Sequence, residues 1–257
     1  MSLLGIDLAS ERAGGDPNFK LDLGDVVARS FSAWTANFVS FFLVGLIVYS
    51  PVIVAYLALA AVGGEALRVV GFLTLVENLL GLILVGAVTY GVFEHLSGGE
   101  KPGPGEILRK GFSKMGDIWI VGLLTGLGIA LGFCALIVPG LVLLARWWLA
   151  VPVAVIESPG ARAAIERSTA LTEGSRWRVF ALALGSGLAV SVVAIACGAL
   201  TARVLPGPAQ APVRQALLTL IIIPLQSLSA VLPAIAYHDM RKGKEGADVG
   251  ELLRAFD

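Results

Sequence analysis

The sequence predicts an all-α, polytopic integral membrane protein. Its mean hydropathy is +0.84, and 56% of its 257 residues are apolar whereas only 15% are charged. An ordinary soluble domain has about 25% charged residues, so this composition lies far outside that class. Six apolar segments mostly have the length that a helix needs to cross a bilayer. They are residues 38–62, 69–93, 118–138, 140–156, 179–200 and 215–237.

The N-terminal residues differ from a cleavable signal peptide. Residues 1–20 contain three acidic side chains and no continuous apolar core, whereas a secretory peptide has a short apolar region behind a basic start. We therefore expect a flexible arm over residues 1–20, a six-helix membrane domain over 21–240 and a cytoplasmic tail over 241–257. Segment 38–62 then inserts as the first, uncleaved helix.

A short amphipathic stretch leads into each pair of apolar segments. In the first two stretches apolar side chains recur at helical spacing; they are Leu23, Val27, Phe31 and Trp34 in the first, and Leu108, Phe112 and Met115 in the second. The third stretch runs over 160–173, with Ser158 expected as N-cap, Pro159 in the first turn and Gly174 at the end. We predict three amphipathic interfacial helices on the cytoplasmic side.

Basic residues occupy corresponding places in the three stretches, namely Arg29, Lys110 and Arg167. The apolar face of an interfacial helix lies at the headgroup boundary, and its basic face can attract anionic lipid. The alternative is that these helices only orient the spans and cover the cytoplasmic side of the bundle.

The distribution of Lys and Arg predicts the orientation. Fifteen of the 19 basic residues lie in the arm, in the loops after the second and fourth segments, and in the tail, whereas only Arg68, Arg203 and Arg214 lie on the opposite side. The positive-inside rule then places both termini in the cytoplasm. Pro139–Gly140 is expected to form a tight turn on the outer side. Since segment 140–156 is at the lower limit for spanning, a re-entrant segment is the alternative there.

Glu77 and Arg146 are the two charged residues inside the six segments. A charge in hydrocarbon is costly and indicates a functional site by default. At about 1.5 Å per helical residue both lie roughly 10–13 Å from the outer side, so an ion pair between them is expected. The alternatives are a polar cavity that binds a solute or lipid headgroup, and an Arg146 that extends to the headgroup region.

Two further polar side chains lie at a similar level. Asn78 follows Glu77 and is expected to satisfy one of its remaining hydrogen-bonding groups. Gln226 is the next deepest polar side chain, and we expect a backbone carbonyl on a neighbouring helix as its partner. Together with the charged pair, these residues are the candidate ligand site.

The sequence contains no recognisable catalytic, cofactor-binding or metal-binding pattern. Cys134 and Cys197 lie inside apolar segments without a CxxC spacing, and no phosphate-binding loop or nucleophile elbow occurs. The His and carboxylate pairs at 94–95 and 238–239 are typical of polar residues at the water interface, with metal ligation as the alternative. We expect no enzyme activity, no cofactor and no metal. The zero net charge argues against a nucleic-acid partner.

Three stretches resemble a bacterial family of membrane domains. They are VPGLVLLARWWLAVP at 138–152, IESPGARAAIERSTALTEG at 156–174, and AYHDMR at 236–241 followed by KEG at 244–246. Together they are similar to the glycerophosphoryl diester phosphodiesterase membrane domain and to related uncharacterised inner-membrane proteins, over most of the chain from about residue 21 onward. The resemblance implies a six-helix inner-membrane module without an assigned activity. In some relatives it precedes a soluble phosphodiesterase domain, which this sequence does not contain, so that activity is not expected.

We therefore expect a non-enzymatic module of the bacterial inner membrane that binds lipid or a partner protein. The expected partners are membrane lipids and a membrane protein or second copy of the chain. The alternative is a small transporter or lipid translocator that uses a polar site around Glu77 and Arg146, since proline-kinked spans also occur in transporters.

Overall fold

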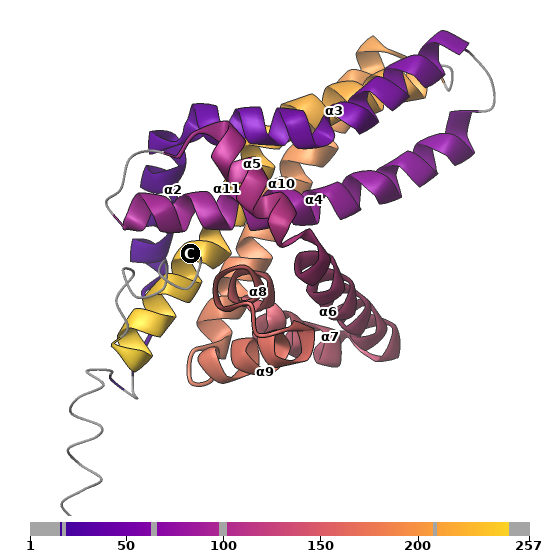
Figure 1. Cartoon of the computed structure of the whole chain (residues 1–257). Helices are drawn as coiled ribbons and strands as arrows, with labels where there is room; N and C mark the ends of the chain where they lie inside the picture. Colours follow the sequence, from indigo (N-terminus) through magenta and orange to yellow (C-terminus); the bar gives the residue numbers. More distant parts are fainter. Residues whose placement is uncertain (1–15, 17–18, 63–65, 98–101, 208–209, 247–257) are drawn as a thin grey trace, which may run out of the picture.

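The computed structural model describes residues 16, 19–62, 66–97, 102–207 and 210–246, and all regular elements in these ranges are helices. Most of the predicted arm at 1–20, and residues 247–257 of the predicted tail, lie outside the described residues. The helices, shown in Figure 1, are α2 (Leu23–Ala36), α3 (Phe38–Val62), α4 (Ala66–Leu96), α5 (Pro104–Ser113), α6 (Met115–Ala135), α7 (Ile137–Trp147), α8 (Ala150–Glu157), α9 (Ala161–Leu171), α10 (Arg176–Val204) and α11 (Ala211–Glu245).

The described part of the chain contains six helical segments that are long and apolar enough to cross a membrane. This confirms the predicted number, and the segments are Phe38–Val62, Arg68–Leu96, Met115–Ala135, Ile137–Glu157, Arg176–Val204 and Ala211–Glu245. The last helix continues well beyond residue 237, so the first residues of the predicted tail extend α11 rather than start a separate segment.

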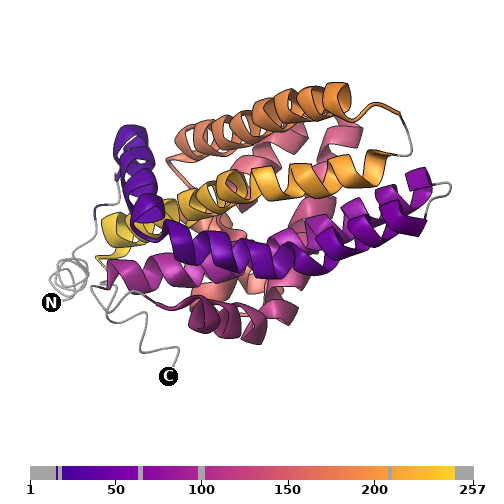
Figure 2. The same ribbon diagram turned by 90° about the horizontal axis from the view of Figure 1, so that it is seen from above.

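Helix α11 forms the centre of the bundle. Figure 2 shows it between α10 on one side and α3 on the other. Its second half buries a run of small and branched residues, including Ala230, Val231, Ala234 and Ile235, against the buried faces of α3 and α4. Small side chains let neighbouring helices approach closely, so the most buried helix also positions side chains from several others.

The predicted turn at Pro139–Gly140 is wrong. The chain breaks at Leu136, whose extended backbone (φ −164°, ψ 151°) separates α6 from α7. Pro139 instead lies in the first turn of α7, where the missing N–H has no helical acceptor to lose. The fourth apolar segment is broken once more at residues 148–149, which separate α7 from α8.

The start of α7 lies beside the start of α10. Val138 and Trp177 line the same apolar groove of about 300 Å³, although the sequence placed these residues on opposite sides of the membrane. Figure 1 shows the α3–α4 pair extending toward the upper right, whereas α6 runs toward the lower right. Helix α6 therefore runs at an angle to the α3–α4 pair.

Helices occur at all three predicted amphipathic stretches, as α2, α5 and α9. In α2 the buried residues are Val26, Ser30 and Ala33, whereas Val27 and Phe31 of the predicted apolar face are exposed. Small side chains therefore pack against α11, and the larger apolar ones face outward. This arrangement is compatible with contact to lipid at an interface.

The predicted start of the third short helix is wrong. Ser158 has a left-handed backbone (φ +48°) and ends α8, while Gly160 (φ +87°) is the N-cap of α9. The positive φ of Gly160 is one that a side chain disfavours, which explains a glycine at this position. Gly174, also with positive φ, follows α9 in the turn that leads to α10, near the predicted end.

Candidate functional site

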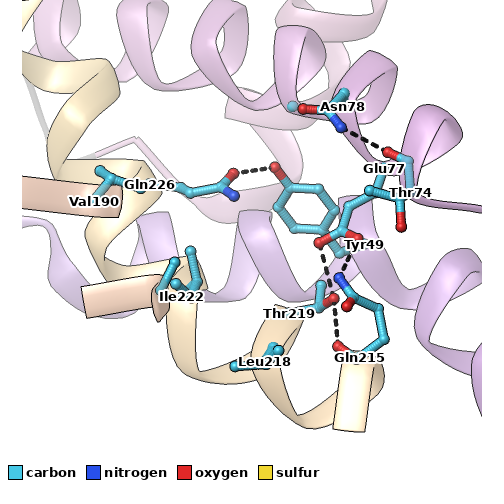
Figure 3. Close-up of a pocket in the computed structure, with 12 residues that line it drawn as sticks. Tyr49, Thr74, Glu77, Asn78, Val190, Gln215, Leu218, Thr219, Ile222 and Gln226 are labelled. Atoms are coloured by element: carbon cyan, nitrogen blue, oxygen red, sulfur yellow. Dashed lines mark hydrogen bonds between the residues drawn. The ribbon is translucent and has the colours of Figure 1, made fainter. Parts of the chain in front are cut away.

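Three of the four predicted site residues come together in a polar cavity. Glu77, Asn78 and Gln226 line a space of about 250 Å³ between α3, α4, α10 and α11, shown in Figure 3. Hydroxyl and amide side chains that the sequence analysis did not single out complete its polar wall, namely Tyr49, Thr74, Gln215 and Thr219.

Glu77 is the centre of this cavity and is only 9% exposed. Its Oε1 accepts a hydrogen bond from Thr219 Oγ1 at 2.9 Å. Its Oε2 accepts bonds from the hydroxyl of Tyr56 at 3.2 Å and from Nε2 of Gln215 at 3.3 Å. Three neutral donors from α3 and α11 thus surround the carboxylate, which reduces the cost of removing it from water.

Two amide side chains on neighbouring helices extend the polar wall. The Asn78 nitrogen donates to the carbonyl of Thr74 at 2.7 Å. The predicted hydrogen bond between Asn78 and Glu77 does not occur. The Gln226 oxygen accepts a hydrogen bond from the hydroxyl of Tyr49, not the backbone contact that we expected. Figure 3 shows both amides beside the ring of Tyr49.

The predicted ion pair between Glu77 and Arg146 does not occur. Both residues are described, and the structure places them apart: Arg146 lies on α7, and its carbonyl accepts a hydrogen bond from Ser168 on α9 at 2.7 Å. The Nε atom of Arg146 is buried without a hydrogen bond to any described residue. Arg146 therefore belongs to the region around α9 and does not contribute to the polar cavity.

A second cavity of about 410 Å³ adjoins the first. The two share the lining residues Asn78, Gly81, Val190 and Gln226. Most other residues of the second cavity are apolar, including Leu82, Val85, Trp148, Val151 and Ala230. We call the two together the intramembrane cleft. It has a polar end at Glu77 and an apolar end toward α8.

Sequence reasoning missed the five other polar residues of this site because their types are ordinary in membrane helices; they are Tyr49, Tyr56, Thr74, Gln215 and Thr219. Tyr49 and Tyr56 lie within segment 38–62, and Thr219 within 215–237. A search for polar side chains at the depth of Glu77 would have found Tyr56 and Thr219, which lie six residues before the end of α3 and eight after the start of α11.

The predicted interfacial basic residues contact other protein groups. Arg29 pairs with Asp239 and lies 3.6 Å from Asp25. The Lys110 ammonium lies 5.8 Å from the centre of the Tyr90 ring. Anionic lipid binding by these side chains stays a prediction, since the structure gives them partners on the protein itself.

Arg167 belongs to a network that joins α8, α9 and α11. Its Nε donates to both carboxylate oxygens of Glu157 at 3.1 Å, and it contacts Glu245 at 2.6 Å. The hydrogen bond to Glu245 raises the pKa of Arg167, although burial opposes this. Tyr237 donates to Glu157 at 2.7 Å, and Arg241 donates to the same oxygen at 3.2 Å. We call these five residues the Glu157 network.

The network unites two of the stretches on which the family resemblance rests. Glu157 and Arg167 come from 156–174, whereas Tyr237, Arg241 and Glu245 come from the final stretch. Among the described residues, no three His, Cys, Asp or Glu side chains are grouped so that they could hold a metal ion. The five side chains form ion pairs and hydrogen bonds that join α8, α9 and α11.

Comparisons with protein-family models, with curated proteins and with solved structures give no match to this chain. The resemblance to the phosphodiesterase membrane domain therefore stays a prediction.

Proposed function

We propose that this protein is a non-enzymatic integral membrane protein that binds a lipid in the intramembrane cleft. The observation that carries the proposal is the union of a polar end around Glu77 with a larger apolar end. A polar group inside hydrocarbon is costly to bury, and its presence there indicates a functional site. A lipid has the matching chemistry, with a polar headgroup and apolar chains.

The proposal includes a location and an orientation. The family resemblance and the six apolar segments support a bacterial inner membrane, and the distribution of Lys and Arg supports cytoplasmic termini. The exposed apolar side chains of α2 support an interfacial position for that helix. Exposed apolar surface on the bundle is also compatible with a membrane protein partner or a second copy.

The test uses a variant that fills the cleft. Gly187 on α10 lines its apolar end, and a Cβ atom at this position would meet no atom within 4 Å. The first side-chain atom of a Gly187→Leu variant therefore has room, and the residue occupies a position in the lining of the cleft. Gly185→Leu is the matched control, because it is on the same helix with equally open surroundings but lines neither cavity.

Native mass spectrometry of both variants after gentle extraction reads out lipid binding. We expect the wild type and Gly185→Leu to retain lipid, and Gly187→Leu to lose a substantial part of it. Equal retention by all three proteins would show that the cleft is not a lipid site.

A second candidate function is lipid translocation. The lining residues of the cleft run along α11 from Gln215 to Pro233, which is about 27 Å of helix. The hydrocarbon core of a bilayer is about 30 Å thick. A cleft of this length, with polar side chains along part of it, would let a headgroup move between leaflets while its chains stay in lipid.

Translocation is tested in vesicles that contain a lipid with a fluorescent headgroup. A membrane-impermeant quencher reports how much of this lipid reaches the outer leaflet. Faster exchange with the wild type and Gly185→Leu than with Gly187→Leu would support translocation. Binding without exchange would restrict the function to lipid binding.

A further inference from the structure

The described lining of the cleft has one acidic side chain and no basic one. Among the described residues that line either cavity, Glu77 is the only charged one. Its hydrogen-bond donors, Tyr56, Gln215 and Thr219, are all neutral. No ion pair to Glu77 occurs within the described residues, although a buried charge normally has a counter-charge.

Three arginines near the cleft do not pair with Glu77. Arg68, nine residues earlier on α4, is exposed and forms no ion pair with it. Arg214 directly precedes Gln215, but its guanidinium donates to the carbonyls of Leu205 and Gly207 in the loop before α11. Arg146 lies beside α9. These arginines therefore leave Glu77 without a cationic partner among the described residues, and a cationic ligand would supply one.

The amide beside Glu77 has an oxygen that can accept a further hydrogen bond, and the free amide nitrogen of the cavity belongs to Gln226, whose oxygen accepts from Tyr49. The Asn78 nitrogen donates to Thr74, and the Gln215 nitrogen donates to Glu77. These bonds fix the orientation of both amides, because a flipped amide would set oxygen against oxygen. The side-chain oxygen of Gln215 receives no hydrogen bond from a described residue and belongs to the amide that contacts the carboxylate. Figure 3 shows the Asn78 amide on the other side of the Tyr49 ring, away from the carboxylate.

We propose that the lipid bound in the cleft carries a primary ammonium group, which binds Glu77 and the amide oxygen of Gln215. This inference rests on the proposed function. A primary ammonium has three N–H donors, so it can donate to the carboxylate and to the amide oxygen at once. A quaternary ammonium has no such donor, and a headgroup without a cation gives the carboxylate no counter-charge. The ligand class is therefore a lipid with a primary ammonium headgroup and with its chains toward the apolar end, and phosphatidylethanolamine is the probe for it.

The first experiment needs no variant. The full-length protein in detergent is offered phosphatidylethanolamine, phosphatidylcholine and phosphatidylglycerol with identical chains, in equal amounts, and retained lipid is measured by native mass spectrometry. We expect phosphatidylethanolamine to exceed each of the others by about tenfold, the effect of one additional strong polar interaction. Equal retention of the three lipids would overturn the inference.

A second experiment tests Glu77 directly. Glu77→Gln keeps the side-chain size and removes the charge, and we expect the preference for phosphatidylethanolamine to fall to near onefold. Glu94→Gln is the matched control, since it makes the same change on α4 at a position that lines neither cavity. A preference that persists in Glu77→Gln would overturn the inference, and so would one lost equally in Glu94→Gln.

Two further measurements distinguish failure of this inference from failure of the proposed function. Glycerophosphoethanolamine has the same headgroup without chains, and we expect it to compete only weakly; strong competition would identify a free amine solute instead. If Gly187→Leu retains lipid as well as the wild type, the proposed function itself fails. If Gly187→Leu loses lipid but the wild type shows no amine preference, only this inference fails.

Discussion

The hydroxyl of Tyr237 donates a 2.7 Å hydrogen bond to Oε1 of Glu157, which lies 80 residues earlier in the chain. Arg167 and Arg241 bind the same carboxylate. Glu157 therefore links the end of α8 to α9 and to α11. These contacts fix the C-terminal end of α11, whereas the intramembrane cleft begins near the N-terminal end of the same helix.

We expect Glu157→Gln to destabilise the protein by about 2–3 kcal/mol. The substitution keeps the shape but leaves two partly buried guanidinium groups without the carboxylate, and breaking such pairs is more costly than breaking exposed ones. Tyr237→Phe removes one hydrogen bond and should cost about 1 kcal/mol. Thermal unfolding in detergent measures both effects.

Arg162→Ala is the control for this prediction. Arg162 pairs with Glu166 on α9, but its side chain is 93% exposed. Exposed pairs contribute about 0–1 kcal/mol, so little change is expected. A Glu157→Gln effect no larger than that of Arg162→Ala would show that the Glu157 network is not structural.

Much of the fold could be predicted because hydropathy reports on burial in lipid, which does not depend on the partner helices. The six apolar segments and the three short helices before them all correspond to helices in the structure. Boundaries were less accurate where a single backbone angle decides them, as at Leu136 and Ser158.

The sequence predicted those residues of the candidate site that can be identified from their depth along a helix alone. Glu77, Asn78 and Gln226 share a level in the bundle and lie in one cavity. The predicted ion pair of Arg146 with Glu77 was wrong. Its depth had been estimated from the number of residues after Pro139, on the assumption that the fourth segment is one straight helix. The Glu157 network also depends on which helix faces meet, and residues 80 apart carry no local signal of that.

We expect the effects of Glu77→Gln and Arg146→Gln on stability to be additive. The two residues have no contact or shared partner in the structure, and distant sites add within about 0.5 kcal/mol. Glu77→Gln and Thr219→Val should instead couple by about 0.5–3 kcal/mol, because these residues share a hydrogen bond. Thermal unfolding of the single and double variants gives both values, and coupling of the first pair would restore the predicted ion pair.

Helix α2 should lie at the membrane interface with its large apolar side chains toward lipid. Phe31 is 55% exposed, and the exposed Ser32 lies about 100° further round the helix, on the same side as Asp25. A nitroxide label at position 31 should be more accessible to oxygen, and one at position 32 to a water-soluble nickel chelate. Spin-label relaxation in vesicles measures this contrast. Equal accessibility of both positions to the chelate would place α2 in water.

The α6–α7 pair should be accessible from the side where α10 begins. Val138 shares a groove with Arg176 and Trp177, and Arg146 contacts α9. Cys134 is exposed just before this turn, so its reactivity reports where the turn lies. In a Cys197→Ala background, a membrane-impermeant thiol reagent should reach Cys134 only from the side that labels a cysteine placed at position 177.

The reference for the other side is a cysteine at position 206, in the loop between α10 and α11. Right-side-out and inverted vesicles present the two faces separately. If Cys134 reacts together with position 206, α6 crosses the whole bilayer and the fourth apolar segment is a full span. If it reacts together with position 177, α6 and α7 enter and leave on one side. Because such a pair removes two crossings at once, both termini stay on the same side in either case, as the distribution of basic residues requires.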